Sequence, residues 1–167
     1  NYINSISGRH MLLWNGGCHV HEKFSVQAIA ALKRRYPDAL VMAHLECKAP
    51  VLAMADVKGS TAAMLTYAQA HPEQKQFIVA TEAGILFELQ RRCPGQEFIP
   101  VPPEVSEGEQ LDSTVPTSCT CNECEFMKLN TLEKIIAALE HLQPEVTIPE
   151  DIAHDAVKPI ERMLALS

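Results

Sequence analysis

The sequence predicts an α/β fold, in which parallel strands form a sheet with helices packed on its faces. Short apolar runs alternate along the chain with longer stretches whose apolar residues recur at helical spacing. This alternation is typical of parallel sheets, because consecutive parallel strands need a crossover connection that is usually a helix. The chain has 167 residues, of which 47% are hydrophobic. That is sufficient for one ordinary domain, or two small ones, with a core that needs no disulfides.

Four apolar runs are the predicted strands. The first, HMLLW at residues 10–14, is stopped by Gly16 and Gly17, which favours a short buried strand. The other three strands are predicted at residues 39–43, 76–80 and 98–101. Helices are predicted around these runs, at residues 24–36, 49–54, 61–71 and 84–92.

The second part of the chain has a different pattern. Residues 102–118 are rich in proline and acidic residues and have no apolar period, which predicts a loop. Beyond it, Asn130 and Glu133 fit a helix-capping pair in front of an apolar stripe of Leu and Ile residues. A last helix is predicted over residues 149–166, broken or restarted at Pro159.

The charge balance disfavours some classes of partner. With 21 acidic and 14 basic side chains the formal net charge is −7, so general binding to nucleic acid or to an anionic membrane is not expected. No apolar run approaches the roughly 18 residues of a membrane span, and the first residues lack the pattern of a signal peptide. These features predict a cytoplasmic protein with reduced cysteines. Because the chain begins at Asn1, we expect it to be part of a longer protein.

Titratable and sulfur-containing side chains follow three of the predicted strands. In an open parallel sheet the ligand site lies beyond the carboxyl ends of the strands, so these side chains are expected to share one edge. They are Cys18, His19 and His21 after the first strand, His44, Glu46 and Cys47 after the second, and Thr81 and Glu82 after the third.

Cys18 is the first candidate ligand. Its flanking glycines and nearby histidines in GGCHVH favour a ligand over the small buried residue that a lone cysteine usually is. In an extended segment His19 and His21 point opposite ways, and His21 is the one predicted to face the pocket of Cys18. An exposed or internally paired histidine is the alternative.

The second strand leads into a histidine and an acid. His44 and Glu46 are two residues apart, so they share a side if the strand continues through them, while Cys47 faces the core. A base and an acid facing one cavity suit proton transfer, and a surface ion pair is the alternative. The GST triplet at residues 59–61 opens a helix, where it either binds a carboxylate or phosphate or serves as a routine cap.

The segment CTCNEC, residues 119–124, is the densest group among the six cysteines. A Cys-x-x-Cys pair such as Cys121 and Cys124 fits a zinc knuckle, a redox pair or part of an iron–sulfur cluster. A closed zinc site needs four ligands, and no second such pair follows. The cysteine spacing of a bacterial ferredoxin is also absent, which disfavours an electron-transfer ferredoxin.

Taken together, several segments make the chain resemble the quinolinate synthase family, iron–sulfur enzymes of NAD biosynthesis. The segments occur in the family's order and span nearly the whole chain. They are LLWNGGCHVH, AHLECKAPVLAMAD followed by KGST, ATEAG, CEFMKLNTLEK and the closing PIERMLALS.

The resemblance implies three-layer αβα Rossmann-like domains with parallel sheets, as part of a pseudo-threefold architecture of three domains. One cysteine from each domain would hold a 4Fe-4S cluster at their junction and leave the fourth iron open to substrate. Cys18 and Cys124 are the matching ligands here, and Cys119 and Cys121 would be accessory. The third ligand would precede Asn1.

The resemblance also implies roles for other residues. The family's His-Pro-Glu-Cys motif corresponds to residues 44–47, with Leu45 in place of proline and a cysteine that is not a ligand. The Ser-Thr pair matches the one that anchors a substrate carboxylate. With His21 included from the pocket argument, the candidate residues are His44 and Glu46 for catalysis and Ser60, Thr61 and His21 for substrate binding.

The implied reaction is the condensation of iminoaspartate with dihydroxyacetone phosphate to quinolinate, a transferase reaction in which the open iron is a Lewis acid for dehydration. L-Aspartate oxidase is the implied functional partner. Residues 1–20 would end the middle domain, 21–125 would form an αβα domain, and 126–167 would be helices packed on a neighbouring domain. Without the third ligand the chain alone is expected to be inactive. The alternative is a non-catalytic zinc-binding α/β module.

Overall fold

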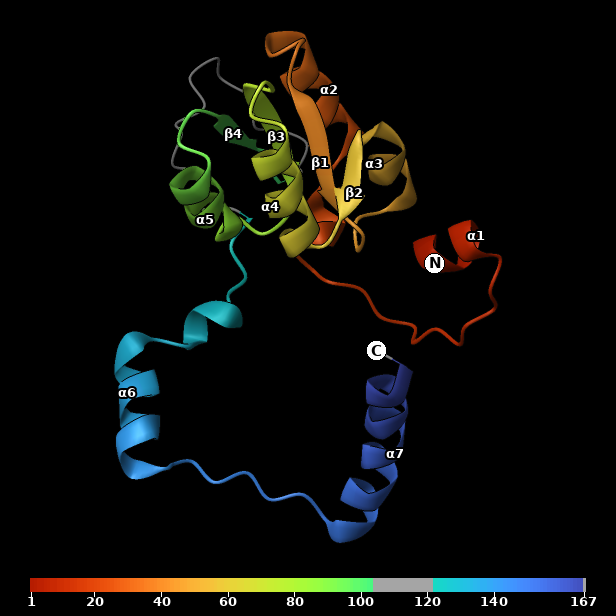
Figure 1. Cartoon of the computed structure of the whole chain (residues 1–167), viewed down its shortest axis with the longest axis vertical. Helices are drawn as coiled ribbons and strands as arrows, with labels where there is room; N and C mark the ends of the chain where they lie inside the picture. Colours follow the sequence, from red (N-terminus) through yellow and green to blue (C-terminus); the bar gives the residue numbers. More distant parts are fainter. Residues whose placement is uncertain (104–121, 167) are drawn as a thin grey trace, which may run out of the picture. The chain divides into compact units, whose positions relative to one another are not determined.

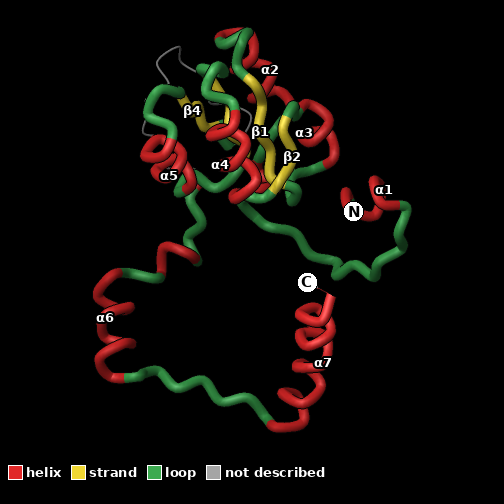
Figure 2. Tube along the Cα trace, viewed as in Figure 1, coloured by secondary structure: helices red, strands yellow, loops and turns green. Residues whose placement is uncertain are grey.

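The computed structural model describes residues 1–103 and 122–166. It divides into two compact units, Asn1–Glu125 and Phe126–Ser167. The first unit contains the sheet, and the described part of the second consists of helices and their connections (Figure 2).

A four-stranded sheet forms the centre of the first unit, and all its strands run parallel (Figure 1). The strand order is β2-β1-β3-β4, so that β1 and β3 are the central strands. Both are continuous apolar runs, as expected for strands that are buried on two faces. The strands are β1 (Leu40–His44), β2 (Val57–Gly59), β3 (Gln76–Ala80) and β4 (Glu97–Pro100).

Helices cover both faces of this sheet. In β1, Val41 and Ala43 pack in a core cluster with α2 and α3, whereas Met42 packs in a second cluster with α4 and α5. Alternate side chains of one strand thus reach opposite layers. This three-layer αβα arrangement confirms the predicted fold class. The helices of this unit are α1 (Tyr2–Ser7), α2 (Val26–Arg35), α3 (Ala49–Met54), α4 (Thr61–Ala70) and α5 (Ile85–Arg92).

Serine side chains begin two of these helices. Ser25 caps α2, where its Oγ accepts a hydrogen bond from the backbone N–H of Ala28 at 3.2 Å. Ser60 caps α4 in the same way, accepting from Ala63 at 3.2 Å. Each hydroxyl satisfies one of the amide groups that a helix leaves unpaired at its start.

The predicted strand at residues 10–14 is wrong. These residues are exposed, with Leu12 at 101% and Trp14 at 92% of full exposure, and none of the described strands pairs with them. An apolar run forms a strand only where another strand satisfies its backbone groups. The prediction also missed β2, whose three residues Val-Lys-Gly are too short and too polar to stand out. The other three predicted strands correspond to β1, β3 and β4.

The second unit contains helices with mostly exposed side chains. Thr131 caps α6, where its Oγ1 accepts from Lys134 N at 3.3 Å, so the predicted cap at Asn130 is wrong. Glu133 does interact with the capping Thr131 side chain, as a residue of the helix start. The last helix continues through Pro159 without the predicted break. The described elements of the second unit are η3 (Met127–Leu129), α6 (Leu132–His141) and α7 (Glu150–Leu166).

Two features of the sequence lie outside the described residues. One is most of the predicted loop at residues 102–118, and the other is the pair Cys119 and Cys121. Within the described residues, no helix combines the length and the apolar character needed to cross a membrane.

Candidate functional site

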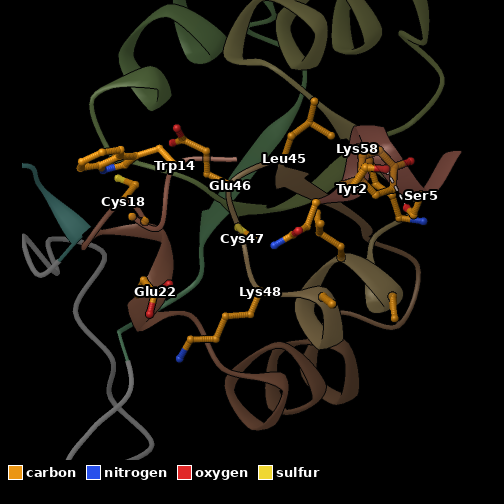
Figure 3. Close-up of a pocket in the computed structure, with 16 residues that line it drawn as sticks. Tyr2, Ser5, Trp14, Cys18, Glu22, Leu45, Glu46, Cys47, Lys48 and Lys58 are labelled. Carbon is orange, nitrogen blue, oxygen red and sulfur yellow. Dashed lines mark hydrogen bonds between the residues drawn. The ribbon is translucent and has the colours of Figure 1, made fainter. Parts of the chain in front are cut away.

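The chain leaves the adjacent strands β1 and β3 toward opposite faces of the sheet. The helix that follows β1, α3, packs on one face of the sheet, whereas α5, which follows β3, packs on the other. Ligands of open α/β sheets bind beyond adjacent strands whose connections diverge in this way. A cleft of about 990 Å³ lies at this edge, with Cys18, Leu45 and Glu46 among its lining residues (Figure 3).

His21 is buried between the ends of these two strands. It begins the short helix η1 (His21–Lys23) and is only 5% exposed. Its Nε2 lies 3.0 Å from Thr81 Oγ1, just after β3. Its ring stacks on His44, the last residue of β1, with 4.5 Å between the ring centroids. His21 therefore joins the segment after Cys18 to both central strands.

Burial keeps the His21 imidazole neutral at neutral pH. Loss of hydration lowers the pKa of His21 below its usual range, and the neighbouring His44 lowers it further. The carboxylates of Glu46 and Glu82 oppose this effect without reversing it. A neutral imidazole is able to accept a proton or to bind a metal ion.

Cys18, His21 and Glu46 form a compact group of donor atoms. The Cys18 sulfur, a ring nitrogen of His21 and a carboxylate oxygen of Glu46 all lie within 4.8 Å of one another. His21 Nδ1 is 3.1 Å from Glu46 Oε2. Cys18 is partly exposed, and the Glu46 side chain is 55% exposed, so a ligand can reach this group from solvent.

His44 and Glu46 are brought together by a turn and not by a continuing strand. β1 ends at His44, and the backbone N–H of Glu46 then donates to His44 Nδ1 at 3.3 Å. The Glu46 carboxylate oxygen Oε2 lies 3.5 Å from the same nitrogen. The expected pairing of a base and an acid at one edge is therefore present, although the predicted strand through both residues is not.

Glu82 holds the segment that contains Cys124. Its Oε1 accepts from the backbone N–H of Cys124 at 3.2 Å, and its Oε2 accepts from Gly84 N at 2.7 Å. Cys124 is 9% exposed and belongs to the core cluster against which Cys18 packs. The described part of the CTCNEC segment thus lies at the end of β3.

Ser60 and Thr61 lie next to His44 at the sheet edge. The register of the sheet pairs His44 with Gly59, the residue just before Ser60. Both hydroxyl residues are exposed, and Ser60 is the cap of α4. A Cβ atom at Gly59 would come within 2.7 Å of the Ala63 Cβ, so only glycine permits this close approach of α4 to the strand. An exposed helix start of this kind suits a carboxylate.

Two lysines that were not predicted from the sequence also line the cleft. Lys48 immediately precedes α3, and Lys58 lies within β2 (Figure 3). Their ammonium groups suit the carboxylate or phosphate groups of an anionic ligand. Lys58 was missed because β2 was missed, and no motif in the sequence marks Lys48.

Comparison with known proteins identifies the family. The family model described as Quinolinate synthetase A protein matches residues 1–165 of this chain. The chain belongs to the quinolinate synthase family. This result confirms the resemblance found from the sequence motifs.

Curated quinolinate synthases match almost the whole chain. The one from Chloroherpeton thalassium is 49% identical over 166 residues, and those from Synechococcus sp. and Thermosynechococcus vestitus are 45% and 47% identical over the same length. Each match covers 99% of this chain but 48% of the relative. The chain therefore spans about half the length of the quinolinate synthases it matches.

The two cysteines implied as ligands by the quinolinate synthase resemblance approach the same sheet edge. Cys18 is three residues before His21, which contacts Thr81, and Cys124 is held by the adjacent Glu82. Both thiols are free. Because iron–sulfur clusters are held by cysteine thiolates, this donor set fits two ligands of such a cluster. No described residue supplies an equivalent third thiol at this edge, apart from the deeply buried Cys47.

Cys47 is poorly suited to bind a metal. It is 5% exposed, and its thiol donates to the Ala80 carbonyl at 3.5 Å. Burial raises the pKa of Cys47 to about 12, so its thiol stays protonated at neutral pH, whereas metal binding requires a thiolate. Its buried position agrees with the prediction that Cys47 belongs to the core.

Proposed function

We propose that this chain is part of a quinolinate synthase and that it supplies Cys18 and Cys124 as ligands to a 4Fe-4S cluster. The observation that carries the proposal is that the two cysteine segments meet the adjacent residues Thr81 and Glu82. When bound, such a cluster supplies an open iron that acts as a Lewis acid for dehydration.

The proposed reaction condenses iminoaspartate with dihydroxyacetone phosphate to give quinolinate, and it releases phosphate and two water molecules. This is a transferase reaction of NAD biosynthesis. Since the chain spans about half of its relatives, the activity is proposed for the longer protein, and the isolated chain is expected to be inactive. A cytoplasmic location and a functional pairing with L-aspartate oxidase belong to the same proposal.

The exposed start of α4 is the proposed binding site for a substrate carboxylate. Ser60 and Thr61 present hydroxyl groups there, next to the unpaired amides of the first helical turn. Lys48 and Lys58 line the neighbouring cleft and supply positive charge for anionic substrates. Electrostatic attraction of this kind matters in a chain whose formal net charge is −7.

His44 and Glu46 are the proposed groups for proton transfer. Both lie at the carboxyl end of β1, with 3.5 Å between His44 Nδ1 and Glu46 Oε2, so that one substrate can contact both side chains. His21 stacks on His44 and contacts Glu46, so it holds both groups in place and borders the substrate. Dehydration requires the removal of a proton and the protonation of a leaving hydroxyl, and His44 and Glu46 are the two groups proposed for these steps.

The domain arrangement also remains a proposal. We propose that residues 21–125 form one of three similar αβα domains around a pseudo-threefold axis, with residues 1–20 closing the preceding domain. Residues 126–167 would pack on a neighbouring domain. The exposed apolar side chains of α6 and α7, among them Ile135 and Ile160, are consistent with such packing.

A hybrid enzyme tests the proposed function. Residues 1–165 would replace the matching part of the Chloroherpeton thalassium relative, and the hybrid would be reconstituted with iron and sulfide without oxygen. We expect a brown protein that forms quinolinate, and we expect Cys18→Ser and Cys124→Ser each to lose both iron and activity. Cys93→Ser is the matched control, because Cys93 is buried in the opposite core cluster. Equal iron content in Cys18→Ser and the parent hybrid would remove the ligand assignment.

The same preparation distinguishes the rival function. A colourless protein that carries stoichiometric zinc, takes up no iron and forms no quinolinate would support a non-catalytic zinc-binding module instead. Quinolinate formation by the isolated chain would contradict the expectation that it lacks a required ligand.

A further inference from the structure

Asp56 joins the start of β2 to the neighbouring strand β1 through two hydrogen bonds. Its backbone N–H donates to the Val41 carbonyl at 2.9 Å, and its carboxylate oxygen Oδ2 accepts from the backbone N–H of Val41 at 2.8 Å. Both backbone groups of one residue in β1 are therefore paired with the residue that immediately precedes β2. A carboxylate acceptor makes a stronger hydrogen bond than a neutral oxygen does.

β2 has few other features that fix its register against β1. It contains three residues, of which Val57 packs in a core cluster, Lys58 is exposed and Gly59 has no side chain. The register of a strand is weakly specified where few apolar side chains distinguish its buried face. The two hydrogen bonds of Asp56 are therefore the contacts that fix where β2 begins.

The register of β2 in turn decides where Ser60 lies. β2 ends at Gly59, which pairs with His44 at the carboxyl end of β1, and Ser60 follows as the cap of α4. A slip of one residue would move the chain by about 3.3 Å. Because N–H···O hydrogen bonds span only about 2.7–3.2 Å, such a shift would take Ser60 out of reach of a ligand held beside His44.

We propose that Asp56 is a positioning residue for the substrate carboxylate, because it fixes β2 against β1 and so places Ser60 and Thr61 beside His44. The inference rests on the proposed function, since it takes the start of α4 as the carboxylate site. In this role Asp56 acts through the backbone of β2 and has no contact with substrate.

Backbone NMR of the 167-residue chain measures the register directly. We expect Asp56→Ala to weaken or abolish the interstrand NOE between His44 and Gly59, which are paired in the sheet. It should also speed amide exchange of Val41 at least about tenfold relative to Ile78 in β3, because a hydrogen bond to a charged acceptor is lost. Asp56→Asn keeps an acceptor oxygen, so it should retain the NOE and most of the protection.

The hybrid enzyme measures the consequence for substrate binding. We expect Asp56→Ala to raise the KM for iminoaspartate about tenfold, with a smaller loss of kcat, because a hydrogen bond to its carboxylate is misplaced. The KM for dihydroxyacetone phosphate, which has no carboxylate, should change less. Asp56→Asn should lie near the parent in both values.

Two further variants separate positioning from stability. Ser25→Ala is the matched control, since it removes a helix-cap hydrogen bond at α2 and leaves β2 intact, and it should keep both KM values. In a Ser60→Ala background, Asp56→Ala should have a smaller effect on the KM for iminoaspartate, because the contact that it positions is already absent. Asp56→Glu, whose carboxylate is displaced by one methylene group, gives the same comparison if Asp56→Ala does not fold.

Two results would overturn the positioning role. One is an Asp56→Ala chain that keeps both the NOE and the amide protection of Val41. The other is an Asp56→Ala hybrid that loses stability but, like Ser25→Ala, keeps both KM values. A parent hybrid that forms no quinolinate would instead overturn the proposed function, while the NMR comparison would still decide whether Asp56 fixes β2. The two failures are therefore distinguishable.

Discussion

Glu82 connects a candidate ligand to the sheet through both of its carboxylate oxygens. One oxygen accepts from the backbone of Cys124 and the other from the backbone of Gly84 near the start of α5. Among the described residues it makes no hydrogen bond to Cys18 or to the start of α4, although its charge acts on the nearby His21. Its role at this site is therefore to position Cys124.

We expect Glu82→Ala to lower the free energy of unfolding by about 1–2 kcal/mol, because it removes a charged acceptor from two backbone N–H groups. Chemical denaturation of the chain measures this loss. In the hybrid enzyme the same variant should take up less iron, because the Cys124 segment is no longer held. Glu82→Gln retains one acceptor oxygen and should lie between the parent and Glu82→Ala. Parental stability and iron content in Glu82→Ala would contradict the positioning role.

At the scale of residues, the sequence predicted which side chains gather but not how they touch. The nearness of Cys18 and His21 was expected from their spacing, and the nearness of His44 and Glu46 from a strand that in fact ends at His44. The contact between His21 and Thr81 joins residues 60 positions apart. Tertiary packing alone decides such a contact, so no local sequence pattern predicts it.

At the scale of elements, two serine caps of equal geometry allow a matched comparison. Ser25 begins α2 and Ser60 begins α4, and each accepts a backbone hydrogen bond at 3.2 Å. Only Ser60 lies at the edge of the sheet beside His44. The two positions therefore separate the stability of a helix cap from a role in binding substrate.

We expect Ser60→Ala and Ser25→Ala each to lower the free energy of unfolding by about 1 kcal/mol, the usual cost of losing a serine cap. In the hybrid enzyme Ser60→Ala should also raise KM about tenfold or more, since a hydrogen bond to a charged carboxylate contributes roughly 1.5–3 kcal/mol. Ser25→Ala should leave KM at the parental value. Equal KM in the two variants would show that Ser60 is a cap and nothing more.

The elements that the sequence predicted well are those whose burial is complete. β1 and β3 are covered on both faces, so their apolar runs are unbroken and their bounds nearly match the predictions. The run at residues 10–14 is just as apolar, but it is exposed. The prediction failed there because a hydrophobic pattern does not say whether a partner strand is present. β2 was not predicted, because an edge strand of three residues is too short to show a pattern of apolar and polar side chains.

At the scale of the whole molecule, the two units differ in how much of their apolar surface is buried. The central strands are almost wholly buried, whereas every described residue of α7 is exposed. Short helices whose apolar faces remain in water have little stability of their own. The chain should therefore not behave as one cooperative structure.

Amide hydrogen exchange tests this difference. We expect the amides of β1 and β3 to exchange about a thousandfold or more slowly than free amides, because opening a core strand costs several kcal/mol. Those of α6 and α7 should exchange almost freely in the isolated chain. In the hybrid enzyme, which restores the rest of a quinolinate synthase, α6 and α7 should become protected. Equal protection of α7 and β3 in the isolated chain would contradict this expectation.

The stacking of His21 on His44 has a consequence for how this site can change. The imidazole, which comes from a segment outside the sheet, contacts residues at the carboxyl ends of both central strands. A single substitution at position 21 would therefore remove a neighbour from Thr81, His44 and Glu46 at the same time, without touching the hydrogen bonds that pair the strands.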